Sequence, residues 1–83
     1  MKKRRTEEEM KEQSALSLFI REKRKNLGLT QNEISLRVGV GLAFYKRLEG
    51  GDVNLQLAKV LQVLAYLGAE MVPAMKNERE LHE

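Results

Sequence analysis

The chain has 83 residues, one histidine, no cysteine and a formal net charge of +3. This length allows one small domain, near the lower limit of what a single hydrophobic core stabilises, which favours dimerisation. Without cysteine, and with a single histidine, neither a disulfide framework nor a zinc site can form, so we expect no metal and no cofactor. No apolar run is long enough to cross a bilayer, and the basic start leads into acidic residues, so we predict a cytoplasmic protein without a membrane association.

Basic residues concentrate in the middle of the chain. Residues 21–50 carry seven basic and three acidic side chains, whereas residues 54–83 carry three basic and four acidic ones. A local excess of positive charge favours a polyanionic partner such as nucleic acid. A charge run is also typical of a merely solvated surface, so charge alone does not decide between the two.

Glycines follow the amphipathic runs of this sequence at intervals that predict four short helices, because a glycine in the left-handed conformation commonly ends a helix. The glycines in such positions are Gly28, Gly39, Gly50-Gly51 and Gly68. The pattern therefore predicts an all-α fold.

The first predicted helix precedes residue 28, and its start is ambiguous. Thr6 followed by Glu9 makes a capping box, whereas Ser14 would cap a shorter helix. We expect residues 1–5 to be disordered and residues 6–13 to be marginally helical, so residues 1–13 form an extension before a domain over residues 14–68. Its apolar face consists of Leu16, Phe19, Ile20 and Leu27.

The second and fourth predicted helices supply much of the core. Thr30 is the predicted N-cap of the second helix, Glu33 closes a capping box, and Ile34 and Val38 face inward. The fourth helix is predicted over about residues 55–67. Its apolar stripe consists of Leu57, Val60, Leu61, Leu64 and Leu67.

The third predicted helix, over about residues 42–49, is too short to be stable without its neighbours. Three residues, 39–41, join it to the second helix, a length that suits a helix-turn-helix, and Val40 fills the core beneath the turn. Tyr45 and Leu48 face the interior. The other side of the helix carries Leu42, Ala43, Lys46 and Arg47, with Phe44 beside them. Apolar side chains on an exposed face indicate a binding partner.

Several stretches of the sequence resemble the helix-turn-helix of the phage repressor and Cro superfamily, the XRE-type regulators. They are Leu27-Gly28-Leu29-Thr30-Gln31, Glu33-Ile34, Arg37-Val38-Gly39-Val40 and Leu48-Glu49-Gly50-Gly51. The resemblance covers residues 16–68 and implies a compact, lambda-repressor-like domain of four to five helices that binds double-stranded DNA. The second helix of such a motif enters the major groove by its N-terminal residues. The apolar front of residues 42–44 would then contact base edges and thymine methyl groups rather than water.

The resemblance also implies roles for single residues. Gln31 matches a position that bonds a phosphate and braces the recognition helix, although it could be an ordinary polar residue of a first turn, and Thr30 is a cap with a secondary phosphate contact. Gly41 matches a position that is often Ser or Thr, and its backbone N–H can still donate a hydrogen bond to a phosphate. Leu42 and Ala43 match positions where many relatives have Gln or another polar residue.

Two basic residues and one aromatic residue complete the predicted DNA-binding set. Arg47 is predicted to contact guanine, because its fork matches the O6 and N7 acceptors, and Lys46 to contact a phosphate or a base. The alternative is a solvated surface pair. Phe44 either contacts the groove or packs against the turn. The full set is Thr30, Gln31, Gly41, Leu42, Ala43, Phe44, Lys46 and Arg47.

A structural ion pair is implied between Arg24 and Glu49. These residues match positions at which phage repressors join the first helix to the end of the recognition helix, and the forked guanidinium suits such pairing. The alternative is two unconnected surface charges.

The segment over residues 69–75 predicts a short β-strand. It follows a helix-ending glycine and alternates apolar with polar residues, and Pro73 confines it to an edge. A lone strand needs a ladder partner, so we predict a homodimer whose two copies pair there, through Ala69, Met71, Val72 and Pro73. Such a dimer would place two recognition helices roughly 34–36 Å apart on a palindromic operator. The alternative is a frayed tail, and residues 76–83 are predicted to be a polar tail.

The stretch "GVGLAFYKRLEGGDVNLQLAKVLQVLAYLGAEM", residues 39–71, resembles the Hip-type antitoxin repressors, above all in the run that follows the recognition helix. This implies a repressor that autoregulates its operon and binds a HipA-like serine/threonine kinase toxin. A stand-alone XRE-type regulator and a protein-binding adaptor without DNA binding remain alternatives. We predict no enzyme and no catalytic residue, because the lone His82 lies in a polar tail and the sequence has no phosphate-binding glycine loop.

Overall fold

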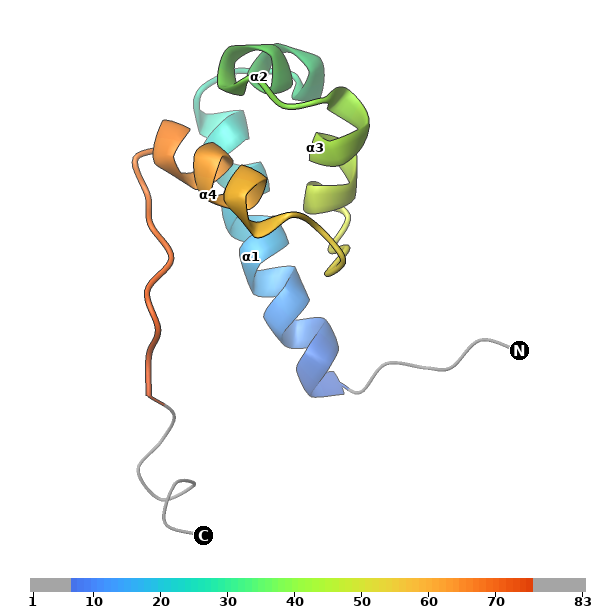
Figure 1. Ribbon diagram of the computed structural model, residues 1–83, viewed down its shortest axis with the longest axis vertical. Coiled ribbons are helices and arrows are strands. Elements are labelled where there is room, and N and C mark those ends of the chain that lie inside the picture. Colours follow the sequence, from blue (N-terminus) through green and yellow to red (C-terminus); the bar gives the residue numbers. More distant parts are fainter. Residues whose placement is uncertain (1–6, 76–83) are drawn as a thin grey trace, which may run out of the picture.

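A computed structural model describes residues 7–75 of the chain, with side chains from residue 15 onward. Four α-helices follow one another in this part: α1 (Glu7–Asn26), α2 (Gln31–Val38), α3 (Leu42–Glu49) and α4 (Leu57–Tyr66). Helices α2, α3 and α4 surround the C-terminal half of α1, whose N-terminal half extends away from them (Figure 1). The predicted compact, all-α domain with a helix-turn-helix is confirmed.

The first helix is longer than a start at Ser14 would allow, because α1 begins at Glu7 and continues without a break to Asn26. The predicted Thr6 cap, the predicted disorder of residues 1–5 and the polar tail over residues 76–83 lie outside the described residues. Between residues 7 and 75, none of the helices combines the length and the apolar character needed to cross a bilayer.

The hydrophobic core is small and draws on every helix. Its buried members are Ile20, Ile34, Val40, Tyr45, Leu48, Val60, Val63 and Leu64. The predictions for Ile34, Val40, Tyr45 and Leu48 are therefore confirmed. Val40 is buried directly after Gly39, whose φ of 90° lets the chain leave α2, and the amides of both residues donate to the Ser35 carbonyl.

Two predicted core positions of the first helix are wrong. Phe19 is exposed, and Leu27 is exposed because it follows the last helical residue, so the helical spacing no longer applies to it. The inward positions of α1 are Ser17, Ile20 and Arg24, which are spaced i, i+3 and i+7 along one face. The predictions for Ile20 and Leu16 are confirmed, because Ile20 is buried and Leu16 packs against the core. Ser17 and Arg24 are polar, which is why apolar periodicity did not identify the whole face.

The predicted stripe of the fourth helix is correct at Val60, Leu64 and Leu67, which is packed against the core, and wrong at Leu57 and Leu61. Val60, Val63 and Leu64 are buried, whereas Leu57 and Leu61 are exposed. The helix begins at Leu57 rather than at residue 55. Because nearly every position of α4 is apolar, periodicity did not determine which side would meet the other helices.

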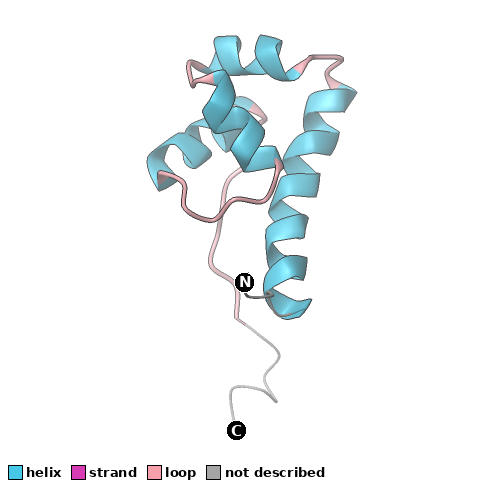
Figure 2. Ribbon diagram, turned by 90° about the vertical axis from the view of Figure 1, so that its right-hand side faces the viewer, coloured by secondary structure: helices cyan, strands magenta, loops and turns pink. Residues whose placement is uncertain are grey.

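The predicted C-terminal strand is not formed in the single chain. Residues 69–75 have no regular secondary structure and continue from α4 as an extended segment, drawn as a loop in Figure 2. The Ala69 amide donates to the Leu64 carbonyl, and Ala69 packs against the core. A β-strand is defined by its ladder, and the described residues offer this segment no neighbouring strand.

Candidate nucleic-acid interface

The start of α2 is closed by a reciprocal capping box. The Thr30 hydroxyl accepts a hydrogen bond from the Glu33 amide at 3.0 Å, and the Glu33 carboxylate accepts one from the Thr30 amide at 2.8 Å. The hydrogen bond from the Thr30 backbone lowers the pKa of Glu33, with a further contribution from the Thr30 side chain. The predicted cap is thus confirmed, and Thr30 stays at the surface at the N-terminal end of the motif.

The start of α3 has no side-chain cap. Gly41 is its N-cap, and the first turn contains no acidic residue. The unpaired amides at a helix start carry partial positive charge and are suited to a phosphate oxygen. The backbone contact predicted at Gly41 therefore has a donor-rich environment, which a capping Ser or Asp would otherwise occupy.

The two faces of α3 differ as predicted. Tyr45 and Leu48 are buried, whereas Ala43, Lys46 and Arg47 are exposed and Leu42 is partly buried. Phe44 packs against the core, and the Lys59 ammonium of α4 lies 5.7 Å from the centre of its ring. The structure thus shows Phe44 packed inside the domain, which is one of the two predicted alternatives. A contact of its remaining surface with DNA stays a prediction.

A bidentate ion pair connects the end of α1 to the end of α3. Arg24 Nε donates to Glu49 Oε2 at 2.7 Å, and Arg24 Nη2 donates to Glu49 Oε1 at 3.1 Å. The remaining Nη1 donates to the Leu29 carbonyl at 2.8 Å, in the link between α1 and α2. Only 11% of the Arg24 side chain and 6% of the Glu49 side chain are exposed, so the pair is shielded from solvent. The Arg24 guanidinium therefore connects the end of α1 to the link between α1 and α2 and to the end of α3.

Glu49 also receives the amide of Gln31. The Gln31 Nε2 donates to Glu49 Oε1 at 3.0 Å, which is the bracing contact that the resemblance implies for this residue. Burial opposes the charged form of Glu49, but the hydrogen bonds from Arg24 and Gln31, together with the nearby Tyr45 hydroxyl, outweigh it and lower the pKa of this carboxyl. The start of α2 is thereby joined to the end of α3, and the phosphate contact of Gln31 stays a prediction.

Burial raises the pKa of Tyr45 because it disfavours the charged phenolate. The neighbouring Glu49 carboxylate raises it further because it repels a second negative charge. The Tyr45 hydroxyl is buried without a partner in good hydrogen-bonding geometry. The phenol therefore stays neutral and acts as a packing element beneath α3.

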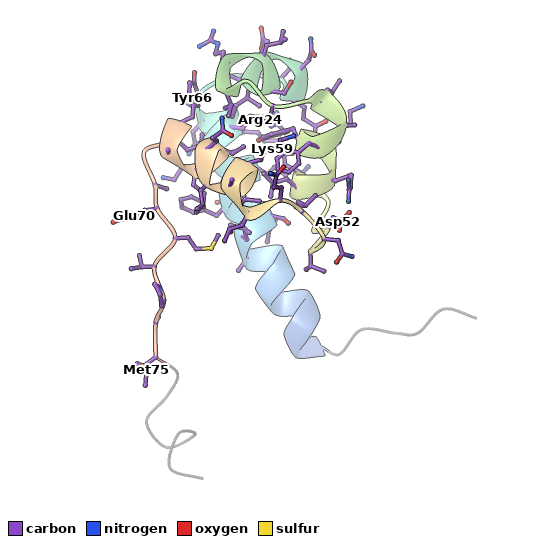
Figure 3. All side chains as sticks on the ribbon, in the orientation of Figure 1. Arg24, Asp52, Lys59, Tyr66, Glu70 and Met75 are labelled. Atoms are coloured by element: carbon purple, nitrogen blue, oxygen red, sulfur yellow. The ribbon has the colours of Figure 1, made fainter. Side chains whose placement is uncertain are left out.

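Arg47 has partners that the sequence did not reveal. Its Nε donates to Asp52 Oδ2 at 2.8 Å, and its Nη2 donates to the Asn54 carbonyl at 3.2 Å. Asp52 lies in the loop between α3 and α4, five residues after Arg47 and outside the helical periodicity (Figure 3). Lys46 has no comparable contact in the described part of the chain, and both side chains remain exposed.

Two further contacts between helices were not predicted from the sequence. Ser17 donates from Oγ to the Leu48 carbonyl at 3.0 Å, which ties α1 to α3 a second time. Arg37 Nη1 donates to the Tyr66 hydroxyl at 3.5 Å, between α2 and α4. Ser17 lies three residues before Ile20, on the same face of the helix, which was the available signal for the first contact. Nothing in the sequence indicated the second.

Among the side chains of residues 15–75, no group of three or more His, Asp or Glu residues could hold a metal ion. The arrangement supplies instead a braced short helix with an exposed basic face. This face offers hydrogen-bond donors, positive charge and apolar contact, which are groups used in recognition.

The helix-turn-helix family matches residues 20–72, most of the described domain, and the chain belongs to this family. An uncharacterized HTH-type transcriptional regulator, y4mF, from Sinorhizobium fredii is 39% identical to this chain over 64 residues. The match covers 77% of this chain and 84% of that relative.

Proposed function

We propose that this protein is a sequence-specific DNA-binding transcriptional repressor whose α3 enters the major groove. The observation that carries the proposal is the exposed Ala43, Lys46 and Arg47 face on a helix that is anchored behind by the Arg24, Glu49 and Gln31 contacts. A recognition helix must be held rigidly, because base contacts depend on hydrogen-bond geometry. The uncapped start of α3 adds backbone donors toward a phosphate.

Binding of the full chain to a labelled duplex of mixed sequence should weaken steeply with salt. If six to ten phosphates are contacted, the affinity falls by about 10³–10⁵ between 50 and 200 mM salt, because counterions are released from the DNA. Lys46→Ala should lower the magnitude of the salt slope by about 1 if Lys46 contacts a phosphate. Arg21→Ala removes an exposed basic side chain of α1, outside the motif, and should leave the salt slope unchanged.

A protein-binding adaptor on the same scaffold is the alternative of a different class. Exposed apolar residues such as Leu36 on α2 and Leu57 on α4 are the observation that favours it. No measurable duplex affinity at low salt would contradict the DNA-binding proposal and favour the adaptor.

We infer a homodimer that pairs the segment over residues 69–75 with its copy. Met71, Val72 and Met75 are exposed, and beyond Ala69 the described structure gives this segment no backbone hydrogen bond. Pairing two copies would satisfy these groups and bury the apolar side chains. The two copies of α3 would then address a palindromic operator.

A chain truncated after Gly68 should lose the dimer at low micromolar concentration and bind operator more weakly, because the two half-sites are no longer engaged together. The mass in solution, measured by light scattering, tests this directly. A truncated chain that remains dimeric, with unchanged duplex affinity, would contradict the segment's role.

Within the class of regulators we favour a Hip-type antitoxin that represses its own operon and holds a HipA-like kinase. The support is the resemblance of residues 39–71 to that group. A stand-alone XRE-type regulator is the alternative, and a neighbouring gene that encodes no kinase would favour it. Purification of the chain together with the kinase of an adjacent gene would support the antitoxin role.

A further inference from the structure

We propose that Asp52 is a positioning residue for DNA recognition, which holds Arg47 so that the Nη1 and Nη2 end of its guanidinium contacts a guanine. This inference rests on the proposed DNA-binding function and adds to it a residue outside the recognition helix. Asp52 lies on the loop that follows α3 (Figure 3).

The first support is the edge of the guanidinium that the loop uses. Nε is occupied by Asp52 Oδ2 at 2.8 Å, and Nη2 by the Asn54 carbonyl at 3.2 Å. These contacts engage the side of the fork formed by Nε and Nη2. Nη1 makes no hydrogen bond within the described residues, and Nη2 retains its second N–H. The end formed by Nη1 and Nη2 is therefore available for the two guanine acceptors, O6 and N7.

The second support is that Asp52 is itself held from two directions. Its Oδ1 accepts a hydrogen bond from the Asn54 amide at 2.8 Å, and its own amide donates to the Arg47 carbonyl at 3.0 Å. The first of these is the side-chain-to-backbone bond of an Asx turn. Gly51, with a φ of 87°, lets the loop fold back onto the end of α3. The carboxylate thus has a fixed orientation before any ligand arrives.

Solvent exposure argues that this pair orients a side chain rather than stabilises the fold. The Arg47 side chain is 54% exposed and that of Asp52 is 30% exposed, and exposed ion pairs contribute little to stability. A flexible arginine loses rotamer freedom when it binds, and an arginine that is already ordered loses less. The same carboxylate repels nearby phosphates. Asp52 should therefore weaken non-specific binding while it sharpens the choice of base.

The test uses full-length protein and a pool of random-sequence duplexes. The unaltered chain selects its preferred duplex, and affinity is then measured for that duplex and for versions with each base pair replaced in turn. At one guanine, replacement should weaken binding about tenfold or more, the discrimination expected of a bidentate arginine contact. Arg47→Lys should lose this discrimination at the same base pair, because an ammonium has no fork.

Asp52→Asn is the informative variant, because asparagine also forms an Asx turn but removes the charge that pairs with Arg47. It should reduce discrimination at that guanine to below about threefold, leave the other base pairs unaffected, and keep or raise the affinity for mixed-sequence duplex. Glu22→Gln removes an exposed carboxylate from α1 and should preserve all discrimination. In Arg47→Lys with Asp52→Asn, no further loss should occur, because both changes remove one contact.

Retained or sharper discrimination in Asp52→Asn would overturn the proposal and identify Asp52 as a mask over Arg47. A guanine preference that survives Arg47→Lys would also overturn it. If the unaltered chain selects no duplex and shows no salt-dependent binding, the DNA-binding function itself fails, which is a distinct result. Thermal melting of each variant, followed by circular dichroism, verifies that the fold is retained.

Discussion

Arg24→Met is expected to lower the free energy of unfolding by about 3–5 kcal/mol, the range for breaking one partner of a buried ion pair. Arg24 and Glu49 have side chains that are 11% and 6% exposed, and the arginine also donates to the Leu29 carbonyl. The substitution leaves the Glu49 carboxylate shielded from solvent and without its positively charged partner. The neutral Gln31 amide still donates a hydrogen bond to it. Urea denaturation measures the change.

Two further variants separate the ion pair from a general effect of charge. Lys25→Met also replaces a cationic side chain by methionine, at the next residue of α1, which is exposed, and should alter stability by less than about 0.5 kcal/mol. Arg24→Met combined with Glu49→Met removes both charges and should recover part of the loss, because an apolar pair can replace a buried ion pair. A loss below about 0.5 kcal/mol in Arg24→Met alone would mean that solvent reaches the pair in solution.

Ile34→Ala is expected to lower the free energy of unfolding by about 2–5 kcal/mol, because it removes buried methyl groups and leaves a cavity. Ile34 is fully buried on α2, whereas Leu36, two residues further along the same helix, is 72% exposed. Leu36→Ala is therefore the matched control, since it removes a similar volume from the solvent side.

The control should change stability by less than about 0.5 kcal/mol. Thermal and urea denaturation of the two variants under identical conditions provide the comparison. Equal losses in both variants would contradict the prediction that Ile34 is buried and Leu36 is not. They would indicate that Leu36 is covered in solution, for instance by a partner that binds the apolar surface of α2.

Local signals determined most of the helix-turn-helix from the sequence alone. The Thr30 and Glu33 capping box is formed by residues three apart, and the Gly39 turn depends on the conformational freedom of one residue. The inward positions Tyr45 and Leu48 follow from helical spacing within a single short segment. Such features require no knowledge of the rest of the chain, which is why they were predicted correctly.

Ile20, Val60 and Leu64 were predicted correctly, but only tertiary packing decided the rest of the buried faces of α1 and α4. The inner face of α1 includes Ser17 and Arg24, whose polar groups are satisfied by acceptors 31 and 25 residues away in the sequence. Hydrophobic periodicity does not detect polar residues that become buried by such pairing. On α4 the reverse holds, because apolar residues on several sides left the choice to the neighbouring helices, which buried Val63 and exposed Leu57.

The candidate site divides in the same way. The exposed Lys46 and Arg47 face was predicted from the sequence, because those residues lie opposite Tyr45 and Leu48 on one helix. The Arg24 and Glu49 pair followed from family resemblance rather than from any pattern within the chain. The contact of Arg47 with Asp52 depends on how the loop after α3 folds back, and Phe44 is positioned by Lys59 and the core. Local chemistry thus determined which residues lie on the exposed face of α3. Long-range contacts decided how their side chains are held, because orientation depends on partners that only the folded chain brings within hydrogen-bonding distance.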